Sequence, residues 1–121
     1  MEDLVSILKA LGEISRLRAF LALAGVEELC VCEVGKLLGL APATVSRHMS
    51  ILGRAGLVVS QKKGKWVYYR LSSKSDPLFL RWAGSILGND PSLLEDRKRI
   101  GEIRQEVARC CTPREDRGEL P

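Results

Sequence analysis

Residues 31–54 read VCEVGKLLGLAPATVSRHMSILGR and carry the strongest structural signal in the chain. Apolar residues recur at helical spacing before Gly39 and again after Pro42. A glycine suits the left-handed turn at the end of a helix over residues 31–38. A proline suits the first position of a second helix, which we expect to run to about Arg54. The stretch therefore predicts a helix-turn-helix unit.

The segment after this unit changes from helical to alternating periodicity. Residues 57–60 and 66–71 are rich in β-branched and aromatic side chains, which is typical of strands. The intervening residues 61–65 contain glycine and three lysines, so we expect a hairpin with a basic tip. A hairpin directly after a helix-turn-helix unit predicts a wing.

Further helices are expected on both sides of this winged unit. Apolar spacing predicts amphipathic helices over residues 4–11 and 17–24. Asp76-Pro77 and Asp90-Pro91 each resemble an N-cap followed by a proline at the first helical position, and the second of these helices should end near Cys110. The fold class is mainly α with a small β-hairpin, a winged helix-turn-helix with additional terminal helices.

Length and composition indicate one soluble domain. With 121 residues, 45% hydrophobic and 28% charged, the chain is of ordinary globular composition. We expect residues 1–111 to form a domain for DNA binding and dimerisation and residues 112–121 to form a flexible tail. No stretch reaches the roughly 20 apolar residues that a membrane span requires. Met1-Glu2-Asp3 lacks the basic start of a secretory signal, so we expect a cytoplasmic protein.

The positive charge is concentrated in the winged unit. The chain has a net charge of +4, yet between Val34 and Ser75 there are eight basic residues and no acidic ones. Such asymmetry is the electrostatic signature of a face that binds nucleic-acid phosphates.

The candidate DNA-binding residues fall into two groups. The N-terminal part of a recognition helix enters the major groove, and basic residues of a wing contact the phosphate backbone. His48 either contacts DNA or has a hydrogen-bond partner inside the helix-turn-helix unit. The candidates are Pro42, Ala43, Thr44, Ser46, Arg47 and His48 in the helix, and Lys62, Lys63, Lys65 and Arg70 in the wing.

Cys30 and Cys32, two of the four cysteines, stand at the expected start of the helix over residues 31–38. In a cytoplasmic chain, cysteines favour metal binding or redox sensing over structural disulfides. Two helical residues at this spacing point about 200° apart, so one ion could bind both thiols only if the first turn were distorted. Soft thiolates without a neighbouring histidine favour thiophilic ions, namely arsenite, antimonite, cadmium and lead.

Three motifs in this order resemble those of the ArsR/SmtB family of winged-helix repressors, in particular its arsenic-responsive branch. They are ELCVCEV at residues 28–34, TVSRH at 44–48 and GKWVYYRL at 64–71, and the similarity covers roughly residues 4–87. The resemblance implies a homodimer that joins through its terminal helices and binds double-stranded operator DNA of an arsenic-resistance operon. It also implies release from DNA when As(III) or Sb(III) binds cysteine thiolates. The apolar stripes at residues 4–11 and 93–107 fit such a dimer interface.

The chain departs from that branch at Gly35, where arsenite-responsive members often carry a third cysteine. The remaining thiols are Cys110 and Cys111, and our hypothesis is a three-sulfur site of Cys30, Cys32 and one of these two. The alternatives are a two-sulfur site at Cys30 and Cys32, a separate site at Cys110 and Cys111 for a methylated trivalent arsenical, or C-terminal thiols without a role.

Other functional classes fit less well. A cadmium- or lead-responsive repressor and a thiol-redox-responsive repressor stay open as alternatives. Zinc is disfavoured as the regulatory ion because no histidine follows His48. We do not expect an enzyme or a catalytic cofactor, because the single histidine lies in the recognition helix and no catalytic constellation surrounds a cysteine.

Overall fold

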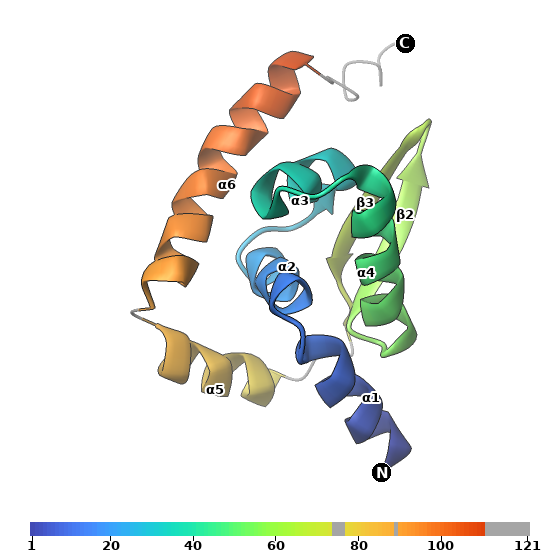
Figure 1. Ribbon diagram of the computed structural model, residues 1–121, viewed down its shortest axis with the longest axis vertical. Coiled ribbons are helices and arrows are strands. Elements are labelled where there is room, and N and C mark those ends of the chain that lie inside the picture. The colour runs from blue at the N-terminus through green and yellow to red at the C-terminus, as the bar shows by residue number, and fades with distance from the viewer. Residues whose placement is uncertain (74–76, 89, 111–121) are drawn as a thin grey trace.

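The structure is a computed structural model that describes residues 1–73, 77–88 and 90–110, with side chains for all of these except 77–79 and 107–110. The predicted flexible tail, residues 112–121, lies outside the described residues. Figure 1 shows the arrangement of the elements. In chain order they are α1 (Glu2–Leu11), α2 (Ile14–Ala24), β1 (Leu29–Cys30), α3 (Val31–Leu38), α4 (Pro42–Arg54), β2 (Val58–Lys63), β3 (Trp66–Leu71), α5 (Pro77–Leu87) and α6 (Pro91–Cys110).

The helix-turn-helix unit is confirmed as α3 and α4, and its turn depends on Gly39. Gly39 adopts the left-handed conformation with φ 70°. Its backbone N–H and that of Leu40 both donate to the Gly35 carbonyl, at 2.8 and 3.0 Å, which closes the end of α3. Pro42 then begins α4, as expected.

The wing is one strand larger than the predicted hairpin. The sheet has the order β1-β3-β2, and the two residues of β1 pair antiparallel with β3, Cys30 opposite Tyr68. A strand of two residues is too short to show alternation in the sequence, so its pairing across the chain could not be anticipated. The basic tip is also tighter than predicted, because β2 continues to Lys63, which pairs with Trp66.

The core lies around α2, with the sheet and the other helices packed about it (Figure 1). Phe20 and Leu23 of α2 are fully buried, as are Val45 and Leu52 of α4 and Val34 of α3. The apolar faces of α2, α3 and α4 therefore point inward, and the opposite face of α4 is left for a ligand.

The expected dimer stripe on α6 is mostly buried within the same subunit. Leu93, Ile100 and Ile103 are 9%, 6% and 1% exposed, and α6 packs on α2 and α3. The side chain of Val107, the last member of the stripe, is outside the described part. An apolar stripe shows that a helix face is covered but does not show whether its own chain or a second copy covers it.

Within the described ranges, no helix combines the length and apolar character needed to cross a bilayer.

Candidate nucleic-acid interface and thiol site

The recognition helix α4 presents its predicted contact residues outward. Ser46 and Arg47 are exposed, like Pro42 and Ala43 at the start of the helix, whereas Thr44 is half-buried. Among the described residues, Arg47 has no carboxylate partner, so its guanidinium is available to base edges or phosphates.

The basic residues of the wing are exposed, but they are not equivalent. Lys63 forms an ion pair with Glu28 at 3.0 Å and lies over the Tyr68 ring, with its Nζ 4.8 Å from the ring centroid. Lys65 lies over Trp66 at 5.8 Å. Lys62 and Arg70 have no acidic partner in the described part of the chain. Lys63 therefore also links the wing to the segment that precedes β1.

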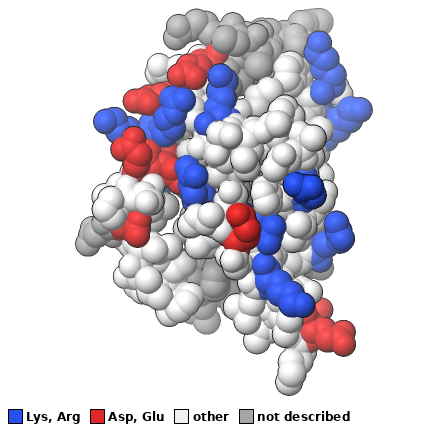
Figure 2. Space-filling view, viewed as in Figure 1, with Lys and Arg blue, Asp and Glu red and all other residues white. Residues whose placement is uncertain are grey.

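The surface charge is divided between two sides of the molecule. Figure 2 shows lysine and arginine gathered along the side of α4 and the wing, with few acidic residues among them. Over α6, basic and acidic side chains are mixed, as the ion pair between Arg99 and Glu106 illustrates. The α4 side is therefore the one suited to a polyanion.

His48 has a hydrogen-bond partner inside the protein, but the partner lies in α2 and not inside the helix-turn-helix unit as expected. Its Nδ1 lies 3.2 Å from Nη1 of Arg16. An arginine can only donate, so Nδ1 is the acceptor in this hydrogen bond. Arg16 Nε also donates to the Ala10 carbonyl at 2.7 Å, so this side chain joins the end of α1 to the recognition helix. A contact between His48 and DNA stays a prediction.

Cys30 is the last residue of β1 and the N-cap of α3, with extended backbone angles and only 1% exposure. Its backbone N–H donates to Oε1 of Glu33 at 2.8 Å, which anchors the first turn of α3. Burial raises the pKa of the Cys30 thiol to about 12, although backbone N–H groups of Glu33 and Cys32 partly offset this by donating to the sulfur. The thiol is therefore protonated at neutral pH.

Cys32 is half-buried at the second position of α3. The expectation that both cysteines lie on one helix is wrong, because Cys30 precedes the helix and the 200° separation does not apply. The two residues are close enough for the charge of Cys32 to affect the pKa of Cys30. The described residues contain no group of three His, Cys, Asp or Glu side chains that could hold a metal ion. Cys111 and the side chain of Cys110 lie outside them.

Helix α6 runs along α3 toward this thiol pair. Asp96 of α6 binds Arg18, whose Nη2 also donates to the carbonyl of Leu37 at the end of α3. Further along α6, Arg104 lies 4.0 Å from Glu33, in the first turn of α3. The last turn of α6 therefore extends past the start of α3, where the cysteines are.

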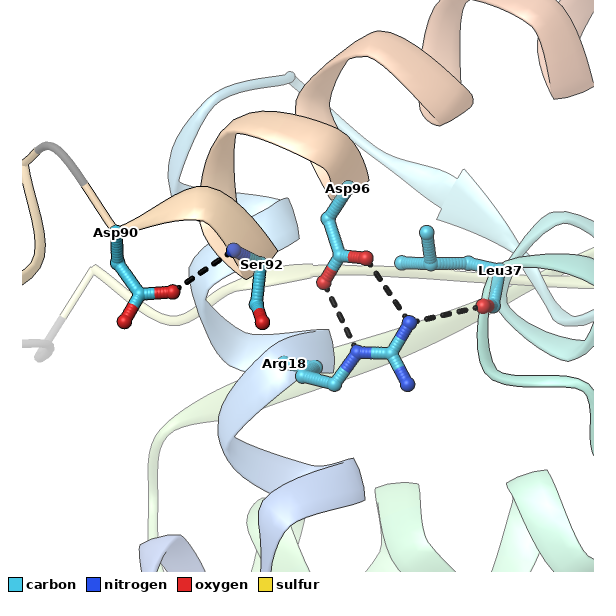
Figure 3. A network of polar contacts seen from close by, with 5 residues as sticks. All are labelled: Arg18, Leu37, Asp90, Ser92 and Asp96. Atoms are coloured by element: carbon cyan, nitrogen blue, oxygen red, sulfur yellow. Dashed lines mark hydrogen bonds and ion pairs between the residues drawn. The ribbon is translucent and has the colours of Figure 1, made fainter.

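The Arg18–Asp96 ion pair is a feature that the sequence did not reveal. Both oxygens of Asp96 accept from Arg18 at 2.9 Å, and Asp96 is only 8% exposed (Figure 3). The hydrogen bond to Asp96 raises the pKa of Arg18 above its ordinary value. In the same view, Asp90 accepts from the backbone N–H of Ser92 at 2.8 Å, which confirms the predicted N-cap of α6. The pair fixes α6 against α2 and the end of α3.

The chain is similar to bacterial transcriptional regulators. Residues 14–60 match the family described as bacterial regulatory protein, arsR family. The arsenical resistance operon repressor of Escherichia coli is 33% identical over 105 residues, which are 87% of this chain and 85% of that protein. The arsenic resistance transcriptional regulator ArsR1 of Pseudomonas putida is 35% identical over 102 residues, 80% of this chain and 77% of its own.

Solved structures agree on the fold. HlyU from Vibrio cholerae superposes with a TM-score of 0.63 at 30% identity, covering 70% of this chain and 91% of its own. The homodimeric winged helix-turn-helix domain Mb0332 from Mycobacterium bovis superposes with a TM-score of 0.64 at 23% identity, covering 72% of this chain and 80% of its own. With its recognition helix, its wing and these relatives, the chain belongs to the arsR family of bacterial regulatory proteins and is a winged helix-turn-helix transcriptional regulator, not an enzyme.

Proposed function

We propose that the protein represses an arsenic-resistance operon by binding its operator DNA as a homodimer, and that it dissociates when As(III) or Sb(III) binds Cys30 and Cys32. The observation that carries this proposal is the position of the two thiols at the start of α3, the helix that supports the recognition helix. Two relatives that align over most of the chain are named for arsenic resistance.

The exposed face of α4 and the wing supply the DNA contacts. Thr44, Ser46 and Arg47 would address base edges in the major groove, and Lys62 and Lys65 would bind phosphates. In a dimer with two such helices, the operator would be an imperfect palindrome with half-sites about 34 Å apart, or a multiple of that distance.

Exposed apolar residues of α1 and α5 supply the surface for the second subunit. Leu4 and Leu8 of α1 are 58% and 57% exposed, and Ile86 of α5 is 59% exposed. Large apolar side chains that are exposed in this way are typical of an association surface. The buried stripe of α6 would then support the dimer only indirectly, by fixing α6 on its own subunit.

Capture of the metalloid is a condensation that needs no oxidant. Each thiol forms a sulfur–arsenic bond, its proton leaves with a hydroxide of arsenous acid, and one water is released per bond. For both sulfurs to reach one arsenic atom, the N-terminal turn of α3 must rearrange around Cys30, which is fully buried. This turn is followed within one short helix by the recognition helix.

The structure offers a second route from Cys30 to the DNA-binding surface. Cys30 pairs with Tyr68 of β3, and Glu28 binds Lys63 of β2, so the segment with the first cysteine is part of the wing sheet. Displacing Cys30 would therefore disturb the wing as well as α3. The wing carries candidate DNA contacts itself, and α3 packs against α4, which carries the others.

For the third ligand we propose the sulfur of Cys110 or Cys111. Support comes from the course of α6, which brings its C-terminal turns past the first turn of α3, as the contact between Arg104 and Glu33 indicates. A two-sulfur site, and a separate C-terminal site for a methylated arsenical, are the competing arrangements.

A second candidate function is a response to cadmium or lead. A relative named cadmium resistance transcriptional regulatory protein CadC homolog, from Staphylococcus aureus, is 35% identical over 72 residues, 60% of either chain. A thiol-redox response is the remaining alternative. Release by peroxide without any metalloid would favour it.

The test is a titration of the protein–DNA complex with each ion. Fluorescence anisotropy of a labelled promoter fragment would be followed while arsenite, antimonite, cadmium, lead and zinc are added in turn, in a buffer without competing thiols. We expect arsenite and antimonite to lower the affinity for DNA by a factor of about 5 to 150, which is the usual range of allosteric coupling. Release by cadmium and lead but not by arsenite would contradict the proposed inducer and identify cadmium or lead in its place.

Single Cys110→Ser and Cys111→Ser variants address the third ligand in the same titration. A weaker response to arsenite in one of them identifies the third sulfur. An unchanged response in both variants leaves the two-sulfur site.

A further inference from the structure

A basic pocket lies between α1 and the C-terminal part of α4, outside the predicted DNA contacts. It has a volume of about 290 Å³, and three cationic side chains, Lys9, Arg16 and Arg54, line it together with the hydroxyl of Ser6. No acidic residue lines it. We call this site the α1–α4 pocket.

The charges of the α1–α4 pocket are not neutralised by carboxylates. Among the residues that the structure describes, neither Lys9 nor Arg54 forms an ion pair, and both are exposed. Arg16 is held by the carbonyls of Lys9 and Ala10 and by His48, which leaves part of its donor set unused. Like charges gathered in one hollow repel one another, and an anion would relieve that repulsion.

The position of the pocket indicates which anion it binds. Arg54 follows Arg47 by seven residues, so the two lie within about 20° of each other around α4 and about 10.5 Å apart along it. Arg47 belongs to the part of α4 that we propose enters the groove, and Arg54 lies further along the helix toward α1. Figure 2 shows several basic side chains on this side of the molecule, with few acidic ones among them.

We propose that the α1–α4 pocket binds a backbone phosphate of the DNA, as an anchor beyond the helix-turn-helix unit and the wing. The inference rests on the proposed DNA binding and adds Lys9 and Arg54 to the binding surface. Phosphate contacts carry no sequence information, so this anchor would strengthen the binding of operator DNA and of unrelated DNA alike. Arg16 would orient α1 against α4 and supply further donors.

The experiment measures how DNA affinity depends on salt for the full chain and for Lys9→Gln and Arg54→Gln. Each phosphate contact contributes about 0.9 to the slope of the logarithm of the association constant against the logarithm of salt concentration. We expect each variant to have a slope shallower by up to about 0.9. Its affinity should fall by the same factor on operator and on unrelated DNA. The matched control is Lys98→Gln, which changes an exposed lysine of α6, a helix without predicted DNA contacts.

The outcomes separate this inference from the proposed function. Unchanged slopes in both variants, equal to that of Lys98→Gln, overturn the phosphate anchor, while operator binding and arsenite release by the unaltered chain would still stand. If inorganic phosphate stabilises the unaltered chain against urea but not Arg54→Gln, and the slopes stay unchanged, the pocket takes a free anion and the DNA assignment is wrong. If the unaltered chain fails to bind DNA, the proposed function and the anchor fall together. Urea unfolding of each variant checks that the fold is intact.

Discussion

At the scale of single residues, Cys30 combines burial with an N-cap position, and its reactivity follows from both. The thiolate is the nucleophile, and the pKa of about 12, against 9.0 for an ordinary thiol, leaves about a thousandfold less thiolate at neutral pH. We predict that iodoacetamide modifies Cys30 at least that much more slowly in the folded chain than in urea. Because the folded pKa is raised, the rate should keep rising with pH up to about 12. Mass spectrometry of Cys30 peptides would measure it, and equal rates in folded and unfolded chain would contradict the buried N-cap.

Among the charged residues, we expect substitution of Asp96 to lower the free energy of unfolding most. Its two hydrogen bonds to Arg18 join α6 to α2, and truncation of one partner leaves a partly buried charge unpaired. Because the side chain of Arg18 is 32% exposed, water compensates in part, and we expect Asp96→Asn to lower the free energy of unfolding by about 1–3 kcal/mol. Urea denaturation would measure this. Glu95→Gln, an exposed neighbour on α6, should change stability little, and an equal loss in both variants would argue against the ion pair.

Such residue-level features are where the sequence was least informative. Arg18, between Leu17 and Ala19, looks like a solvated position of an amphipathic helix, and its partner is 78 positions away. Likewise, nothing near Lys63 in the sequence indicates that Glu28 binds it. Long-range polar pairs depend on how the helices pack, which local periodicity does not encode.

At the scale of elements, the helix-turn-helix unit could be predicted because its signals are local. The predicted boundaries at Leu38, Pro42 and Arg54 are those observed. By contrast, β1 was missed because two residues show no alternation, and its pairing with β3 arises only in the folded chain. The interpretation of the cysteine site changed accordingly, from two thiols on one helix to one thiol in the wing sheet and one on α3.

Gly39 tests the turn between α3 and α4. A side chain at φ 70° is strained, so we expect Gly39→Ala to lower the free energy of unfolding by about 1–2 kcal/mol and to weaken operator binding by tilting α4. Gly101 of α6 is the matched control, since it is helical and no atom lies within 4 Å of an added Cβ. Gly101→Ala should be neutral or stabilise by up to about 1 kcal/mol. The left-handed turn would be contradicted if the two variants had the same stability.

At the scale of the whole molecule, the proposed operator binding requires a dimer. We predict that Leu8→Glu places a charge in the apolar surface of α1 and produces a monomer, which sedimentation velocity would detect. Operator affinity should fall with it, because two linked recognition helices bind far more tightly than one. Lys98→Glu, which introduces the same residue on exposed α6, should remain dimeric. A dimeric Leu8→Glu protein would place the interface elsewhere.

The coupling between thiol chemistry and DNA affinity joins all three scales and is tested most directly by the Cys30→Ser/Cys32→Ser double variant. Serine is a preferred N-cap, so α3 and the apo DNA-binding surface should be preserved. The measurement is operator anisotropy with arsenite raised to saturation. We predict that the unaltered protein leaves the operator, whereas the double variant binds with similar affinity and stays bound. Release of the double variant at the same arsenite concentration would contradict the account.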